Sequence, residues 1–413
     1  MTERLKAIEI CAGAGGQALG LHQAGFDHKL AFELDDNACE TLKQQSIVDE
    51  VVKGDVADPE KWKLAKEFKG IDLLAGGVPC PPFTIAGKQL GADDERDLFA
   101  WTVEQVAELE PRALLLENVR GLSMPRFAGY RQHVLDRLTT MGYFAEWRLL
   151  QASDFNVPQL RPRFVLVALK AEYADYFAWP EPQGEAPTVG KTLKKLMGSA
   201  GWEGAADWAK KANKIAPTIV GGSKKHGGAD LGPTRAKEAW KLLGVDAMGV
   251  ANEPPQSGDT FDIGPKLTCE MVARIQGFPP GTFFSGRKTA QYRQIGNAFP
   301  PPVAKAVGDA IHKALSGKGE RVPRGETEHD PVYRALKKAG DFVKAETLIK
   351  TSDGQIDVPD LERRISLLQR DFDVDVVTSN GTTLYRLGKF KAFTGQHDHS
   401  RHEVFLKNRA RIS

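Results

Sequence analysis

The chain has 413 residues, a hydrophobic content of 41%, a charged content of 27% and a net charge of +2. These values are ordinary for a globular protein of two or three domains, and they exclude a polycation, so any nucleic-acid surface must be a local patch. The four cysteines, at positions 11, 39, 80 and 269, form no CxxC pair, which argues against a zinc ribbon or a disulfide scaffold. The N-terminus lacks a signal-peptide pattern and no apolar run reaches about 18 residues, so we predict a cytoplasmic protein without a membrane span.

The first elements are predicted to be a strand, a glycine-rich loop and a helix. The apolar run 6–11 leads into the glycine-rich loop 12–16, and a helical pattern follows. The next two predicted strands end in acids, Glu33 and Asp55. Carboxyl ends of parallel strands meet at one edge of a sheet, so glycines and two acids there are typical of a site for an adenosine-containing cofactor. Each acid taken alone is also consistent with a solvated surface group.

The stretch from Ala75 to Thr84 presents a single cysteine on a rigid loop. Cys80 is flanked by prolines at positions 79, 81 and 82, which restrict the backbone, and it follows an apolar strand. This placement favours a nucleophilic thiol over a structural one. The polar segment 87–97 that follows is typical of a lid over a site.

A second carboxylate is predicted at the same sheet edge. The apolar strand 112–116 leads directly into Glu117, which favours a functional acid over a surface salt-bridge partner. Further on, Gln159, Arg161 and Arg163 alternate along the chain and therefore share a face. Two arginines and an amide suit a phosphate or a carboxylate, although a salt-bridging loop has the same composition.

The amino-acid composition changes after about residue 179. Segment 191–240 holds ten Lys or Arg against four Asp or Glu, and its flexible basic part, 219–228, is suited to follow a phosphate backbone. Tryptophans at 202, 208 and 240 favour a folded unit over a solvated linker. Regular hydrophobic periodicity resumes at 267–278, and Asn297 then precedes a helix predicted over 303–315.

The C-terminal part follows a charged linker, 317–330. Three predicted helices, at 331–338, 344–350 and 358–369, and a hairpin turning at 379–381 indicate a winged-helix-like unit. Its arginines at 363, 364 and 370 would then contact phosphates, whereas a stability or dimer module is the alternative. The tail 391–413 is basic, and its three histidines leave metal binding open, although its polarity favours disorder.

These landmarks, in this order, resemble the DNA (cytosine-5)-methyltransferase family from Lys6 to about Leu315, interrupted by the variable region 175–265. The resemblance rests on the glycine loop, the Pro79-Cys80 motif, Glu117-Asn118-Val119, the Gln-x-Arg-x-Arg run, Arg274 to Pro279 and Gly296-Asn297. It implies an α/β, Rossmann-like S-adenosylmethionine-dependent domain with a smaller target-recognition domain. The expected division is a catalytic and cofactor-binding domain (1–174), a target-recognition domain (175–265), a return segment (266–316), a linker (317–330), a winged-helix-like domain (331–390) and a basic tail (391–413).

The resemblance also assigns roles to residues. The implied catalytic residues are Cys80, Glu117, Arg161 and Arg163, and the target base would contact Pro79, Glu117, Asn118 and Val119. The implied cofactor contacts are Cys11, Ala12, Gly13, Gly15, Gly16, Glu33, Leu34, Asp55, Val56, Gly77, Pro79, Leu98, Asn297 and Phe299. The implied DNA contacts are Lys224, Lys225 and Arg235. The family usually has phenylalanine where this chain has Cys11, so we expect weaker cofactor binding and a second thiol near the site.

The implied reaction methylates carbon 5 of a flipped-out cytosine in double-stranded DNA through a covalent bond from Cys80 to carbon 6. S-adenosyl-L-methionine would be the cofactor and S-adenosyl-L-homocysteine its product, with no metal. We expect a monomer, as an orphan methylase or with a cognate restriction endonuclease. The alternatives are an RNA (cytosine-5)-methyltransferase, since the same motifs occur in a transfer-RNA-modifying branch, and a non-catalytic DNA-binding regulator. A nicotinamide oxidoreductase is a further alternative, but it leaves Cys80 and Glu117 without a role.

Overall fold

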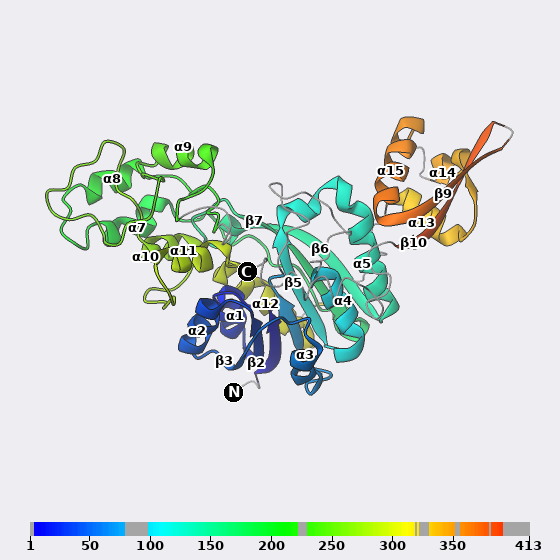
Figure 1. Ribbon diagram of the computed structural model, residues 1–413, viewed down its shortest axis with the longest axis horizontal. Coiled ribbons are helices and arrows are strands. Elements are labelled where there is room, and N and C mark those ends of the chain that lie inside the picture. Colours follow the sequence, from blue (N-terminus) through cyan, green and yellow to red (C-terminus); the bar gives the residue numbers. More distant parts are fainter. Residues whose placement is uncertain are drawn as a thin grey trace.

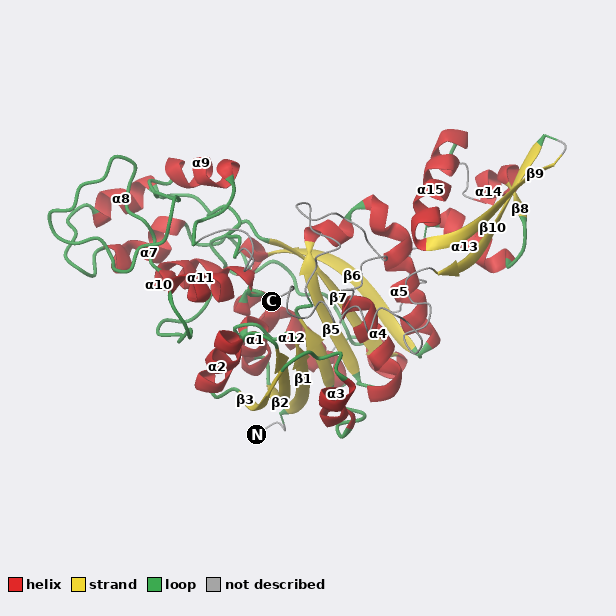
Figure 2. Ribbon diagram, viewed as in Figure 1, coloured by secondary structure: helices red, strands yellow, loops and turns green. Residues whose placement is uncertain are grey.

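The computed structural model describes residues 4–78, 98–221, 229–318, 320–321, 330–351, 356–379 and 381–390. Their largest element is a seven-stranded sheet in the order β3-β2-β1-β4-β5-β7-β6 (Figures 1 and 2). Its strands are β1 (Leu5–Ile10), β2 (Phe26–Glu33), β3 (Val48–Lys53), β4 (Leu73–Gly76), β5 (Ala113–Val119), β6 (Tyr143–Gln151) and β7 (Pro162–Lys170). Strands β1 to β5 are parallel, and β7 is antiparallel to both of its neighbours. The predicted Rossmann-like α/β fold is confirmed.

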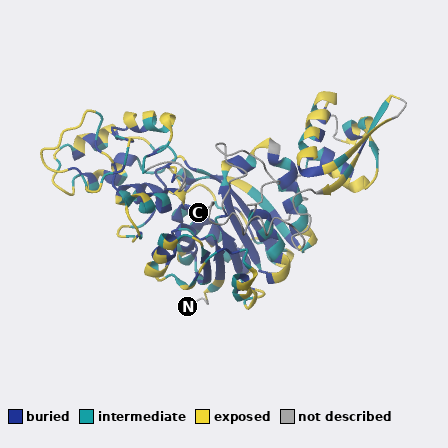
Figure 3. Ribbon diagram, in the orientation of Figure 1, coloured by how far each residue is buried: buried dark blue, intermediate teal, exposed yellow. Residues whose placement is uncertain are grey.

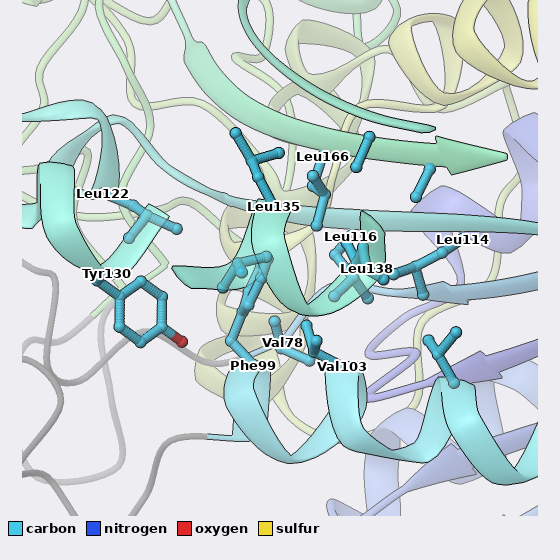
Figure 4. Packing of buried hydrophobic residues seen from close by; sticks show 14 of the residues in the cluster. Val78, Phe99, Val103, Leu114, Leu116, Leu122, Tyr130, Leu135, Leu138 and Leu166 are labelled. Atoms are coloured by element: carbon cyan, nitrogen blue, oxygen red, sulfur yellow. The ribbon is translucent and has the colours of Figure 1, made fainter. Parts of the chain in front are cut away.

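Helices cover both faces of this sheet. They are α1 (Gly16–Gln23), α2 (Asp36–Gln45), α3 (Pro59–Lys66), α4 (Leu98–Leu109), α5 (Ala128–Thr140), α6 (Ala171–Ala174) and α12 (Pro301–Leu315). The strands of the sheet are largely buried (Figure 3). Leu114 and Leu116 of β5 belong to one buried cluster with α3, α4 and α5 (Figure 4). Ala113 and Leu115 belong to another, with α1 and α12. Side chains alternate along a strand, so an all-apolar β5 serves two cores at once.

The strand order reverses between β1 and β4. The chain proceeds from β1 outward to β3, crosses back to β4, and then proceeds outward on the other side through β5. At such a switch point the loops after two adjacent parallel strands diverge, and ligands bind at the carboxyl ends. Here the loop 11–15 follows β1 and residues 77–78 follow β4, so the predicted cofactor loop and the chain leading to Cys80 begin side by side.

A third buried cluster lies beyond the sheet. It includes Trp208 and Trp240, which confirms that the tryptophan-containing region is folded. The helices are α7 (Val189–Met197), α8 (Ala205–Lys211), α9 (Thr234–Leu242), α10 (Cys269–Gln276) and α11 (Lys288–Asn297). Met271 and Ile275 of α10 share this cluster, so one core joins residues on both sides of the predicted boundary at 265. The target-recognition boundaries themselves stay a prediction.

The C-terminal unit, residues 331–390, contains the expected three helices and a hairpin. Its elements are α13 (Pro331–Ala339), β8 (Val343–Lys344), α14 (Ala345–Thr351), α15 (Val358–Asp371), β9 (Phe372–Ser379) and β10 (Thr382–Phe390), with β8-β10-β9 as the sheet order. The winged-helix assignment stays a prediction. None of the helices among the described residues is long and apolar enough to cross a membrane. The described residues do not include 79–97, 222–228, most of the linker or the tail 391–413.

Candidate active site

The loop after β1 has an unusual backbone. Cys11, Gly13 and Gly15 have φ angles of 50°, 55° and 76°, a conformation that glycine adopts readily and cysteine does not. Two hydrogen bonds hold the turn, from Ala12 N to Phe32 O at 3.1 Å and from Gly15 N to Ala12 O at 3.0 Å. A Cβ at Gly13 would meet no atom within 4 Å. The loop therefore leaves open space beside Gly13, as a bound cofactor requires.

Two other glycines near the loop serve close packing. A Cβ at Gly16 would lie 2.4 Å from the carbonyl oxygen of Phe299, so glycine lets α1 approach the start of α12. A Cβ at Gly221 would lie 2.4 Å from Oδ1 of Asn297, the last residue of α11. Sequence reasoning missed this contact because the glycines at 221 and 222 were interpreted only as a flexible loop.

The Glu33 carboxylate organises the end of β2. Its Oε2 accepts a hydrogen bond from Gly13 N at 2.7 Å, and its Oε1 accepts from Leu34 N and Asp35 N at 2.8 Å each. Burial raises the pKa of Glu33, and these backbone donors oppose the shift. Carboxylate oxygens accept more than one hydrogen bond, so Glu33 can hold the loop and still accept from a ligand.

The other predicted cofactor residues follow β2 and β3. Asp55 is buried, and its Oδ1 accepts from Ala57 N at 2.9 Å, while Val56 is buried beside it. Leu34 is 53% exposed although it is apolar.

Burial raises the pKa of the Cys11 thiol well above its usual value, and the carboxylates of Glu33 and Asp55 add to the shift. Cys11 is therefore held as a neutral thiol.

Glu117 lies in a buried position at the end of β5. Its Oε2 would be 3.7 Å from a Cβ on Gly77, which places the carboxylate beside the chain that leads into Cys80. Its Oε1 is 2.6 Å from Nε of Arg163, and both side chains are 10% exposed. The two charges form a close ion pair without the alignment of a hydrogen bond. Burial raises the pKa of Glu117, whereas Arg163 and, to a lesser degree, Arg161 lower it.

Strand register explains why Arg163 reaches Glu117. In the antiparallel pair β5 and β7, Val119 lies opposite Arg163 and Glu117 opposite Val165. Asn118 between them is buried, and its Oδ1 accepts from Val119 N at 2.8 Å. Its Nδ2 has no hydrogen-bond partner among the described residues. This buried amide donor is therefore available to a ligand.

Arg161 has different partners from Arg163. It is 1% exposed, and its guanidinium donates to the carbonyls of Ile219, Gly296 and Ala298 at 2.7, 2.7 and 3.1 Å. Burial lowers the pKa of Arg161 well below its usual value. Gln159 is likewise buried, and its Oε1 accepts from Ile219 N at 2.9 Å. Of the three residues predicted to share one face, Arg163 contacts a carboxylate, while the other two connect separate backbone segments.

The remaining predicted residues are placed only in part. Pro79, Cys80, Lys224 and Lys225 lie outside the described residues. Leu98 is the first residue of α4 and directly follows residue 97. Arg235 is exposed in the first turn of α9.

Comparisons with known proteins identify the family of the chain. Residues 5–313 match the family model for C-5 cytosine-specific DNA methylase. Type II methyltransferase M.NaeI of Lentzea aerocolonigenes is 65% identical over 413 residues, which cover 100% of both chains. Type II methyltransferase M.NgoMIV of Neisseria gonorrhoeae is 50% identical over 75% of this chain and 97% of its own. A prophage-encoded candidate DNA modification methyltransferase of E. coli shares the fold, with a TM-score of 0.54 and 24% identity over 76% of this chain and 99% of that one.

Proposed function

Because the chain belongs to the C-5 cytosine-specific DNA methylase family, we propose that it methylates a flipped-out cytosine in a specific double-stranded DNA sequence through a covalent bond to Cys80. Its activity is that of a DNA (cytosine-5)-methyltransferase. The observation that carries the proposed mechanism is the buried Glu117–Arg163 pair beside Gly77.

Cys80 is the proposed nucleophile. Carbon 5 of cytosine is a poor nucleophile, and a thiolate that adds to carbon 6 makes carbon 5 enamine-like. The new bond joins sulfur to carbon 6, and the electron pair of the ring double bond becomes available at carbon 5. After methylation a base removes the carbon 5 proton, the double bond re-forms and the thiolate of Cys80 leaves.

Glu117 is the proposed partner of the ring at N3. Addition of the thiolate increases negative charge around N3, which a protonated carboxyl or a shared proton stabilises. Burial raises the pKa of Glu117, which favours such a proton, and Arg163 keeps the carboxyl in place. The unpartnered Nδ2 of Asn118 and the backbone at Val119, together with Pro79, are proposed to contact the same base.

The residues around the glycine loop fit S-adenosyl-L-methionine. When bound, this cofactor would supply a methyl group on a sulfonium for carbon 5 and would leave as S-adenosyl-L-homocysteine. Glu33 would accept from the ribose hydroxyls, Gly13 leaves the space open, and exposed Leu34 would cover the adenine. Asp55 with Val56 would bind the adenine edge. The further proposed contacts are Cys11, Ala12, Gly15, Gly16, Gly77, Pro79, Leu98, Asn297 and Phe299.

The proposed partner is double-stranded DNA. A cytosine inside a duplex is unreachable, so it must leave the base stack before an enzyme can modify its ring. The basic segment 191–240, including Lys224, Lys225 and Arg235, would contact the phosphates. The relatives are Type II methyltransferases, which supports a cognate restriction endonuclease as a further partner. Action as a monomer in the cytoplasm belongs to the same proposal.

Trapping with 5-fluorocytosine tests the mechanism. Fluorine cannot leave carbon 5 as a proton, so DNA carrying it at the target should form a denaturation-resistant complex with the protein. Cys80→Ala should abolish both the complex and methylation, whereas Cys269→Ala, which removes a half-buried thiol of α10, should leave both intact. Methylation at the wild-type rate by Cys80→Ala would refute the covalent mechanism. Bisulfite sequencing of DNA and RNA from expressing cells identifies the target and separates the DNA substrate from the RNA alternative.

A further inference from the structure

The C-terminal unit is joined to helix α5 of the sheet domain. The C-terminal unit lies beside α5 (Figure 1). A single buried cluster extends from Tyr130 and Val134 of α5 to Val332, Tyr333 and Phe372 of this unit. The rings of His133 and Phe372 meet edge-on at 5.9 Å. Tyr333 and Lys337 both bond to the Asp136 carboxylate of α5. The two parts therefore share a core and polar contacts, rather than only a linker.

One residue of this unit, Asp371, caps the start of α5. Its Oδ2 accepts a hydrogen bond from Tyr130 N at 3.0 Å, and its side chain is buried, with the residue 4% exposed. Helix α5 begins after Phe127, whose ring has no acceptor, and its first turn contains no acid. The first amides of a helix have no partner within it, so a carboxylate from elsewhere stabilises the start.

Gly129 is what lets this carboxylate approach. A Cβ at Gly129 would lie 2.9 Å from Oδ2 of Asp371 and 3.3 Å from the ring of Phe372. The glycine is thus matched to a residue about 240 positions further along the chain. Arg131, two residues later, also interacts electrostatically with Asp371.

The first turn of α5 also holds the segment that follows Glu117. Nη1 of Arg131 donates to the carbonyls of Leu122 and Met124 at 2.7 and 2.9 Å. These carbonyls lie in and beside the 3-10 turn Arg120–Ser123, which directly follows Val119. The first turn of α5 therefore determines where the chain goes after the Glu117-Asn118-Val119 motif.

The same turn contacts the helix that follows the Cys80 loop. Tyr130 and Leu122 lie in one cluster with Phe99 in the first turn of α4, and the rings of Tyr130 and Phe99 are 6.4 Å apart (Figure 4). Helix α4 begins one residue after segment 79–97 ends. The start of α5 therefore contacts both the chain that follows Val119 and the first turn of α4.

From these contacts we infer that Asp371 is a positioning residue for methyl transfer, which acts from the C-terminal unit by ordering segment 120–131. This inference rests on the proposed roles of Glu117 and Asn118. The alternative role of the unit, phosphate contact through α15, has less support. Arg363 pairs with Asp360 at 2.7 Å, Arg364 pairs with Asp330, and α15 packs against α5.

Substitution of Asp371 tests the inference in the full-length protein. Asp371→Ala should lower kcat about fivefold, the equivalent of one lost helix cap, and leave the Kd of S-adenosylmethionine unchanged. Asp371→Asn should retain more activity, because an amide oxygen still accepts from Tyr130 N. The control is Asp375→Asn, which removes an exposed ion pair with Arg386 in the same unit and should change neither quantity.

Two readouts separate positioning from simple stabilisation. The rate is expressed per site that can be trapped with 5-fluorocytosine DNA, so unfolded protein does not count. Amide hydrogen exchange should become faster in 120–131 and stay unchanged in β1 and β2. Full kcat per trapped site for Asp371→Ala, or an exchange increase spread over the whole chain, would overturn the inference. If the wild-type protein methylates no DNA, the proposed function fails instead, while the exchange comparison still reports on Asp371.

Discussion

Removal of Arg163 should make the stability of this protein strongly dependent on pH. The substitution Arg163→Met keeps an apolar side chain of similar length and removes the cation that lies 2.6 Å from Glu117. Both side chains of the pair are only 10% exposed, so water cannot replace the lost partner. Glu117 is then left as a buried carboxylate whose remaining nearby cation is Arg161, which contributes less to its pKa.

The expected cost follows from the geometry. At 2.6 Å and an effective dielectric constant of about 20, the pair attraction is about 6 kcal/mol. Part of this is offset by the cost of burying two charges, and loss of one partner from a buried pair typically costs about 3–5 kcal/mol. Arg161 remains and also interacts with Glu117, so we expect the lower end of that range at pH 8.

The sign of the pH dependence is fixed by Glu117. Burial raises its pKa in the folded protein above the usual 4.5, and loss of Arg163 raises it further. Between the unfolded and the folded pKa, the folded state holds more protons, so stability falls as pH rises through that window. Denaturant unfolding at pH 8 and at about pH 5 should therefore show a smaller loss for Arg163→Met at the lower pH.

Two further variants make this test decisive. Glu117→Gln combined with Arg163→Met removes both charges and should recover most of the lost stability at pH 8. Arg137→Met breaks an ion pair with Glu104 whose side chains are 37% and 24% exposed, and it should cost about 1 kcal/mol or less. Equal losses for Arg163→Met at both pH values, without recovery in the double variant, would refute the reasoning.

Two other substitutions test the glycine loop and its surroundings. Glu33→Ala should raise the Kd of S-adenosylmethionine about tenfold in calorimetry, while Asp36→Ala on the exposed start of α2 should not. An unchanged Kd for Glu33→Ala would restrict Glu33 to a structural role. Gly16→Ala should lower stability by about 1–3 kcal/mol, because its Cβ would lie 2.4 Å from Phe299 O. A Cβ at Gly70 would meet no atom within 4 Å, so Gly70→Ala should lower the free energy of unfolding by about 1 kcal/mol, from its positive φ alone. Equal melting temperatures for the Gly16→Ala and Gly70→Ala variants would contradict the packing argument.

Local patterns were sufficient to predict the strands of the sheet and the polar residues at their carboxyl ends. The apolar run before Glu117 predicted a strand buried on both faces, and β5 is that strand. A helix was predicted to begin at residue 303, and α12 begins at Pro301, two residues earlier, because proline already has a helical φ. Such effects act within a few residues of the chain, so they can be recognised without knowledge of its path.

The partners of the buried polar groups were decided by the tertiary structure. Nothing in the alternation of Gln159, Arg161 and Arg163 indicates that Arg163 meets a carboxylate while Arg161 bonds three carbonyls. The antiparallel register of β5 and β7 makes the first contact, and the return of the chain at 296–298 makes the second.

The same distinction holds for the C-terminal unit. Its helices and hairpin were predictable from sequence, but its contact with α5 was not, since Asp371 and Tyr130 are 241 positions apart. Asp371 is the last residue of α15, and no local pattern marks it as the cap of another helix. Which carboxylate caps which helix depends on how completed elements pack. A buried donor must find an acceptor within hydrogen-bond distance, and only the folded arrangement determines which one is there.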